Sequence, residues 1–376
     1  MLATFRNIFI DILLCLPLWL CAQENKPGAG FGIDANFFAG HVLRHTPKFH
    51  LPLPDVSTGM DVNFVWKMYG KKPWQQRRKY PTVGIAVAYT NYGIDSVYGR
   101  CFSIYPNITI PIISGKKLEW TIRIGDGAGY VTHHYSRVPF DTANNAISTH
   151  LNDYASFMTD LRYHINNHWD VQLGANFSHI SNAATQQPNL GINLYGAHIG
   201  IRYFPVTSAP QRIIQKIQPL SNRWLYELRL TTARTGANAP LGPSYPVYVV
   251  SAYASRRWKS KNKYFGGIDY SYHSDIAAYL KANSFVSPGT EAAHSYKSAI
   301  FGGNEFLLGR VGVVLQVGVY IHQAFLTQAL YYEKIGGNLY LVQREHGPIK
   351  ELFLCGFLKT HLSVAELAEF GCGVGF

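Results

Sequence analysis

The sequence has few charges and no long apolar run beyond its amino-terminal segment. After residue 22, no stretch approaches the roughly 18 apolar residues that a membrane helix needs. Asp, Glu, Lys and Arg make up only 15% of the chain, whereas Phe, Trp and Tyr make up 14%. The missing run excludes a helical membrane protein, and few charges with many aromatic residues are typical of a transmembrane β-barrel.

Cysteine is also scarce. Of the five Cys in the chain, two lie in the amino-terminal segment, which leaves Cys101, Cys355 and Cys372. An odd number excludes a framework in which every Cys is paired within the chain.

The amino-terminal segment, "MLATFRNIFIDILLCLPLWLCAQ", contains one Arg, a mostly apolar run and a small residue at Ala22. This pattern predicts a secretory signal peptide over residues 1–22. Asp11 and Pro17 interrupt the run, so it is too short to span about 30 Å of hydrocarbon as a helix.

The chain is basic, with 34 Lys and Arg against 22 Asp and Glu and a formal net charge of +12. In an exported chain this balance favours phosphorylated or otherwise anionic lipid as a partner over nucleic acid. The charge run "KKPWQQRRK" at 71–79 is expected on a periplasmic or loop surface, where it could touch anionic headgroups. A plain solvated face is the alternative.

Stretches of alternating apolar and polar residues, each about ten residues long, recur from end to end between clusters of Gly, Pro, Asn or Ser. Single-chain bacterial barrels have even strand numbers, so either one of our candidates is wrong or the short stretch 338–343 is also a strand. We expect an all-β fold, a transmembrane antiparallel β-barrel of about 14 strands, with 12 to 16 possible. The fifteen candidates are 32–42, 60–70, 82–93, 99–110, 118–132, 154–165, 169–181, 192–204, 223–233, 245–258, 263–273, 298–309, 311–322, 351–362 and 364–376.

The last candidate strand places Phe370, Cys372, Val374 and Phe376 in one phase, which predicts a lipid-facing strand. Its aromatic carboxyl end resembles the terminal signal that outer-membrane barrels present to their assembly machinery. We therefore expect that machinery as a partner and the bacterial outer membrane as the location. A soluble β-sandwich is the alternative.

One Pro-rich break, residues 204–223, divides eight candidate strands from the rest. It could be a long loop within one barrel or a boundary between a smaller barrel and an added half. A separate sheet of six or seven strands would leave open edges or a very narrow barrel, so we expect residues 23–376 to form one barrel.

The stretch "VQLGANFSHIS" carries an apolar phase that ends in His179 and Ser181. This seventh strand should run outward, which places the pair at the extracellular rim on the lipid face. The next strand opens with Asn193 on the same face and at the same height. The three residues could form a Ser-His-Asn arrangement, in which the base activates the hydroxyl and the amide orients the base. Ordinary interfacial polar residues are the alternative.

The segment "FSHISNAATQQPNLGIN" resembles the active-site segment of outer-membrane lipid A deacylases of the PagL-like acyloxyacyl hydrolase type. The resemblance covers roughly 30–204, with support from "IRIGDGAGYVT" and "NNAISTHLND", and leaves 223–376 as additional strands. It implies Ser181 as nucleophile and His179 as general base. It also implies positioning or oxyanion-hole roles for Asn182 and Asn189, with backbone amides near Gly191.

The chain departs from that family pattern at two positions. The family's triad acid falls on Asn193, and the Gly that usually follows the Ser-Asn-Ala sequence is here Ala184. An Asn can orient a histidine tautomer but stabilises an imidazolium less than a carboxylate would.

We therefore predict an outer-membrane ester hydrolase that removes an acyl chain from lipid A or a related acylated glycolipid by a Ser/His mechanism. Neither a cofactor nor a metal is expected, and lipopolysaccharide is the expected partner. The alternatives are a channel or transport barrel, and a lipid-binding homologue that has lost activity. The sequence leaves the oligomeric state open.

Overall fold

The computed structural model describes residues 29–138, 143–206, 212–236, 240–323, 329–361 and 364–376. The predicted signal peptide, residues 1–22, lies outside this part of the chain. Among the described residues, no helix is long and apolar enough to cross a membrane.

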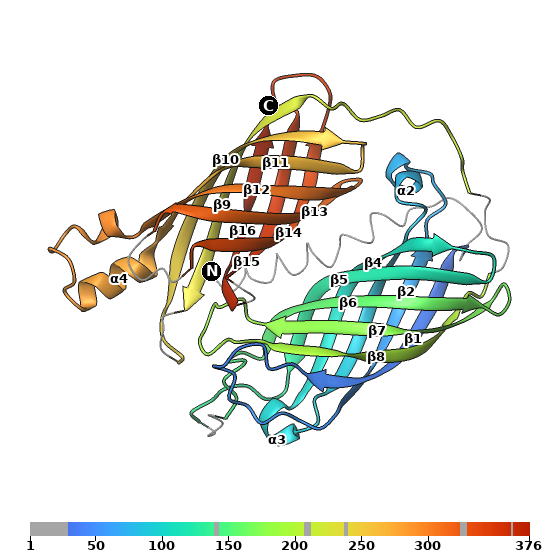
Figure 1. Cartoon of the computed structure of the whole chain (residues 1–376), viewed down its shortest axis with the longest axis horizontal. Coiled ribbons are helices and arrows are strands. Elements are labelled where there is room, and N and C mark those ends of the chain that lie inside the picture. The colour runs from blue at the N-terminus through green and yellow to red at the C-terminus, as the bar shows by residue number, and fades with distance from the viewer. Residues whose placement is uncertain (1–28, 139–142, 207–211, 237–239, 324–328, 362–363) are drawn as a thin grey trace. The chain divides into compact units, whose positions relative to one another are not determined.

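The first eight strands close into an antiparallel barrel, because β1 pairs with β8 as well as with β2 (Figure 1). Two short helices, α2 (Pro73–Arg77) and α3 (Asp95–Tyr98), lie in its connections. The strands are β1 (Phe31–Val42), β2 (Ser57–Lys67), β3 (Thr82–Asn91), β4 (Arg100–Ser114), β5 (Leu118–Val131), β6 (Leu151–His164), β7 (Trp169–Ser181) and β8 (Ile192–Tyr203).

The remaining eight strands close into a second barrel, in which β9 pairs with both β10 and β16 (Figure 1). The connection between β11 and β12 holds α4 (Ser274–Ala282) and the 3-10 helix η2 (Glu291–His294). The strands are β9 (Trp224–Gly236), β10 (Ser244–Trp258), β11 (Asn262–His273), β12 (Tyr296–Leu308), β13 (Val311–His322), β14 (Tyr331–Gln343), β15 (Glu351–His361) and β16 (Val364–Gly375).

The all-β antiparallel barrel architecture is confirmed, and the strand total is at the top of the predicted range. Each of the fifteen candidate stretches overlaps one strand, and 338–343 belongs to a sixteenth, β14. The expectation of one barrel is wrong, since the strands close into two barrels of eight. The physical reason is β14, which brings the second half to eight strands and lets it close without open edges.

The first barrel has two distinguishable ends. We call the end whose connections are longer on average the loop end; its connections are 43–56, 92–99, 132–150 and 182–191. The opposite end, with 68–81, 115–117 and 165–168, is the turn end. Short turns face the periplasm and longer loops face outward in barrels of this kind, so the loop end is the extracellular one.

Side chains alternate between a filled interior and an apolar exterior, as the period-2 pattern predicts. On β16, Phe370 and Cys372 are exposed, whereas Glu369 points inward and is fully buried. The predicted lipid-facing phase of this strand is therefore confirmed.

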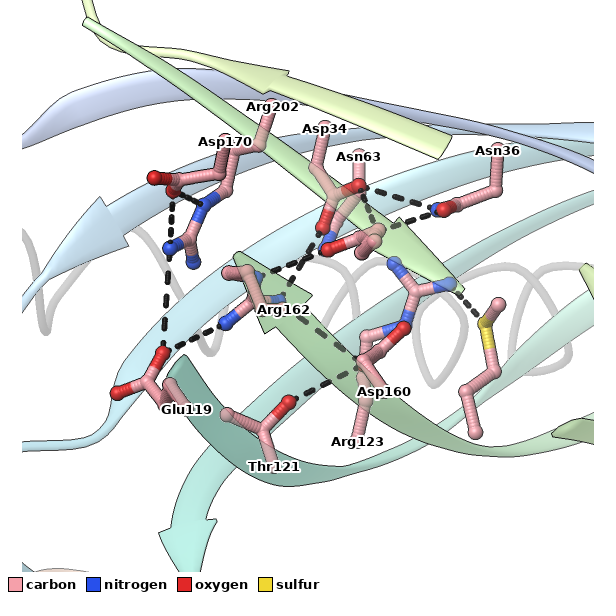
Figure 2. Close-up of polar contacts among 12 residues, drawn as sticks. Asp34, Asn36, Asn63, Glu119, Thr121, Arg123, Asp160, Arg162, Asp170 and Arg202 are labelled. Atoms are coloured by element: carbon pink, nitrogen blue, oxygen red, sulfur yellow. Dashed lines mark hydrogen bonds and ion pairs between the residues drawn. The ribbon is translucent and has the colours of Figure 1, made fainter. Parts of the chain in front are cut away.

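The interior of the first barrel is packed with charged and polar side chains that bond to one another, as Figure 2 shows. Arg162 donates to Glu119 at 2.9 Å and to Gln172 at 2.9 Å, and Arg202 donates to Asp170 at 2.6 Å. An eight-stranded barrel is just wide enough for side chains to fill it.

The second barrel is filled in the same way. Lys263 lies 2.8 Å from Glu351 and 3.1 Å from Glu227 and donates to the Tyr340 hydroxyl at 2.7 Å. Lys334 pairs with Asp269 and with Glu369, each at 2.9 Å. The described interiors therefore hold side chains where a channel would need water, which argues against a channel function.

Replacing Arg162 with Met should lower the free energy of unfolding of the first barrel by roughly 3–5 kcal/mol, because Glu119 and its buried neighbours lose their cation. Urea unfolding of the vesicle-inserted protein measures this. Arg100→Met is the matched control, since Arg100 pairs with Asp95 on the exposed surface and its loss should change stability little. Equal stability of the two variants would contradict the assignment of Arg162 as a structural cation.

Candidate active site

The outward phase of β7 and β8 carries the predicted site residues. Leu173 is 58% exposed and Tyr195 is 47% exposed, so this phase faces away from the interior. His179 and Asn193 belong to it and stand opposite each other in the register. The structure thus places His179 and Asn193 on the outer face of adjacent strands, and Ser181 follows His179 by two residues on β7.

The three side chains form a continuous hydrogen-bonded row. His179 Nδ1 lies 2.6 Å from Asn193 Oδ1, and His179 Nε2 lies 3.0 Å from Ser181 Oγ. An amide oxygen can only accept, so Nδ1 carries the ring proton and Nε2 is left to accept the proton of the serine hydroxyl. This is the tautomer that a general base needs.

The row is covered although it faces outward. Ser181 is 1% exposed and Asn193 is 6% exposed. Where little water is present, the hydrogen bonds within the row are stronger. Developing charge is then stabilised by protein dipoles that are already oriented, and not by bulk solvent.

Gly191 lets the chain pack directly onto the His179 imidazole. Its φ is +75°, which favours glycine, and a Cβ at this position would stand 2.6 Å from His179 Cε1. Its amide donates to the Ala146 carbonyl at 2.9 Å. Because that amide is used within the protein, Gly191 contributes here through close packing, and an oxyanion role for backbone amides near Gly191 stays a prediction.

Asn182 and Asn189 hold the loop that follows the nucleophile. The Asn182 backbone N–H donates to Asn189 Oδ1 at 2.8 Å, and the Asn182 side-chain Nδ2 donates to Ser148 Oγ at 3.0 Å. These contacts give both residues a positioning role, and a donor role of the Asn189 carboxamide toward a substrate oxygen stays a prediction.

Two further connections brace the site, and sequence reasoning did not single out their residues. The Leu43 amide donates to the Asn193 carbonyl at 2.8 Å, and His45 Nε2 donates to the Leu190 carbonyl at 2.9 Å. Leu43 and His45 continue the outward alternation of β1, so the strand register could have found them. Ser148 lies in the stretch "NNAISTHLND", which the sequence analysis used only for its resemblance.

Aromatic side chains close the loop end beneath these connections. Phe49 and Leu51 are buried with Tyr92 and Tyr98, whose ring centroids lie 5.7 Å apart. Burial raises the pKa of Tyr92 well above its usual range, so this cluster stays uncharged at any ordinary assay pH.

A second Ser-His pair lies in the other barrel, in the opposite phase. Ser271 Oγ is 3.2 Å from His273 Nε2, and Asp275 stands 3.7 Å from His273 Nδ1. Ser271 and His273 face the interior, and the cavity beside Ser271 measures about 10 Å³. That is room for about one water molecule, so this pair does not suit an acyl substrate.

In the part of the chain that the structure describes, no group of three or more His, Cys, Asp or Glu is placed to hold a metal ion. The expectation of neither metal nor cofactor stays a prediction.

Two family models match the chain, one for each barrel. The model described as lipid A 3-O-deacylase (PagL) matches residues 58–202. The model described as acyloxyacyl hydrolase, C-terminal domain, matches residues 224–376. The chain belongs to the lipid A 3-O-deacylase family. It is accordingly an ester hydrolase of the bacterial outer membrane that acts on lipid A, and the resemblance found in the sequence is confirmed.

Solved structures show more distant likenesses to this deacylase. The outer membrane enzyme PagL is 18% identical, with 46% of this chain and 99% of that chain covered and a TM-score of 0.33. Neisserial surface protein A is 12% identical, with coverages of 47% and 97% and a TM-score of 0.31. No curated protein sequence matches the chain. The family assignment therefore rests on the two family models.

Replacing Gly191 with Ala should lower the rate of fatty-acid release by up to about 10²-fold, because the new Cβ displaces the His179 ring from Ser181. Release from lipid A by the purified, folded protein measures this. Gly289→Ala is the matched control, since Gly289 also has a positive φ but nothing within 4 Å of the added Cβ. Full activity of folded Gly191→Ala would show that the ring does not depend on this contact.

Proposed function

We propose that this deacylase cleaves the acyl ester with Ser181 as nucleophile, His179 as general base and Asn193 as the residue that orients the base. The observation that carries the proposal is the hydrogen-bonded row from Asn193 Oδ1 through the imidazole to Ser181 Oγ, with distances of 2.6 and 3.0 Å. The family model supports the reaction class, and the row supplies the chemistry within this chain.

In the first half-reaction, His179 Nε2 takes the hydroxyl proton as Ser181 Oγ attacks the ester carbonyl carbon. The tetrahedral intermediate collapses when the bond to the sugar oxygen breaks, and the imidazolium returns its proton to that oxygen. The deacylated sugar leaves, and the acyl chain remains on Ser181.

In the second half-reaction, water replaces the sugar hydroxyl. His179 removes a proton from the water, the resulting hydroxide attacks the acyl-serine carbonyl, and the fatty acid leaves as Ser181 recovers its proton. Asn193 keeps Nδ1 protonated in both halves. The Asn189 carboxamide is the candidate donor to the oxyanion, because its hydrogen bond from Asn182 fixes its orientation.

The position of the row fits a substrate that stays in the membrane. It lies at the loop end on the outward phase, above exposed apolar side chains of the same strands, such as Leu173 and Ile199. An acyl chain of lipid A in the outer leaflet can lie along this face while its ester reaches Ser181. No route through the barrel interior is needed.

We also propose the barrel assembly machinery as a partner. The support is β16, whose Phe370 and Cys372 face outward while Glu369 faces the interior, the alternation of a membrane-inserted strand.

Replacing Ser181 with Ala should lower fatty-acid release by roughly three orders of magnitude or more, because the nucleophile is lost. Folding should survive, since Ser181 is the last residue of β7. Ser178→Ala is the matched control, because Ser178 lies on the same strand in the inward phase and should keep its activity. Undiminished release by correctly inserted Ser181→Ala would rule out this residue as nucleophile.

Replacing Asn193 with Ala should lower the rate by up to about 10²-fold, because the imidazole loses the partner that fixes its tautomer. Asn193→Glu should keep or raise the rate, since a carboxylate at the same place adds charge stabilisation to the imidazolium. Initial rates of fatty-acid release by the Ala and Glu variants, compared with each other, measure how much the residue at 193 contributes. If Asn193→Ala matches the wild type, the third member lies elsewhere or the pair works without one.

A further inference from the structure

The turn end of the first barrel carries a dense group of cations. The connections 68–81 and 115–117 together contain seven Lys and Arg and no Asp or Glu. We call this set the turn-end basic surface: Lys71, Lys72, Arg77, Arg78, Lys79, Lys116 and Lys117. The four lysines at 71, 72, 116 and 117 are exposed.

The basic surface is a built element of the fold. Trp74 and Gln75 of α2 are buried, and Gln75 Oε1 accepts from the amides of Gly70 at 3.1 Å and Lys72 at 3.2 Å. Lys79 Nζ donates to the Ile112 carbonyl at 3.0 Å, near the end of β4. This bond links the segment after α2 to the strand that leads into the Lys116–Lys117 turn, so the two groups of cations form one surface.

Exposed aliphatic side chains lie beside the cations. The Ile213 amide donates to the Tyr69 carbonyl at 2.8 Å, and the Tyr80 hydroxyl donates to the Ile213 carbonyl at 3.1 Å. These bonds hold Ile214, which is 87% exposed, next to α2. Ile113, at the end of β4, is 62% exposed.

Aromatic residues mark the level of the membrane interface at this end. Trp120, Tyr163 and Trp169, all near strand ends, are 42%, 41% and 41% exposed, and the rings of Trp169 and Tyr203 lie 4.5 Å apart. Trp and Tyr gather at the level of lipid headgroups in membrane proteins. Lysine and arginine stems just beyond such a belt lie along apolar surface while their charges reach the headgroup layer.

The nearby carboxylate does not neutralise this surface. Glu119, two residues beyond Lys117, is 2.9 Å from Arg162 in the barrel interior. We propose that the turn-end basic surface binds the phosphate groups of anionic phospholipids in the leaflet opposite the one that holds lipid A. The exposed isoleucines rest on the acyl region while the cations contact the headgroups.

Native mass spectrometry of the full chain from mixed micelles with equal amounts of phosphatidylglycerol and phosphatidylcholine tests this. The wild type should retain phosphatidylglycerol in preference. The combined variant Lys71→Gln, Lys72→Gln, Lys116→Gln and Lys117→Gln should lose at least about half of that preference. In 1 M salt, where the screening length is about 3 Å, the wild-type preference should fall as well.

The matched control removes the same number of charges from the loop end, through Arg44→Gln, Lys48→Gln, Arg100→Gln and Arg137→Gln, and should keep the wild-type preference. If the fourfold variant fails to fold, Lys116→Gln with Lys117→Gln alone should lower the preference, since both lie in a turn outside α2. A fourfold or double variant that folds and keeps the full preference overturns the proposal. A wild type that shows no preference but pellets with peptidoglycan through the same lysines overturns it in favour of a polymer partner.

Discussion

Closure of the sheet is the constraint on which the rest of the structure depends. In hydrocarbon every backbone donor and acceptor needs a partner within the protein, and eight strands satisfy this only when the last pairs with the first. Both halves of the chain meet the condition, through β1 with β8 and through β9 with β16. Closure at eight strands leaves an interior that side chains fill. The charged side chains inside therefore pair with one another. Residues that meet a lipid substrate can then lie only on the outward phase of the strands or in the loops.

The proposed catalytic row depends on both the strands and the loops of the barrel. The strand register alone sets His179 opposite Asn193. Side chains at such paired positions on one face stand about 5 Å apart, which is close enough for them to interact. The final geometry needs more than register, since Gly191 packs on the imidazole and the Asn182 to Ser148 bond holds the segment after the nucleophile. The strands thus fix the height and face of the site, and the loops fix the side-chain positions within it.

The sequence was informative where a local pattern determines the structure. Alternation predicts the strands and the outward phase of His179, Ser181 and Asn193, because one residue of shift would move a whole strand to the other face. It did not reveal two barrels, because the second half reaches eight strands only when β14 is counted. The sequence of β14, "YYEKIGGNLYLVQ", has a Gly pair and two charges in its first half, which obscure the alternation. Alternation continued from β1 indicates the outward phase of His45 but not its partner, because the contact joins the connection after β1 to the loop before β8, which lie far apart in the chain. The contact of the Gly191 amide was not foreseen for a related reason, since its acceptor at Ala146 belongs to another loop.

The central claim is that one outward-facing serine is activated by the imidazole beside it. An alkyl fluorophosphonate, which reacts with activated serine hydroxyls, tests this directly on the purified, folded protein, with peptide mass spectrometry to locate the adduct. The account predicts that loss of deacylase activity follows the appearance of one phosphonyl group on Ser181, in a peptide from β7. Inactivation with the group on another residue, such as Ser271 of the second barrel, or complete labelling of Ser181 with full activity remaining, would contradict it.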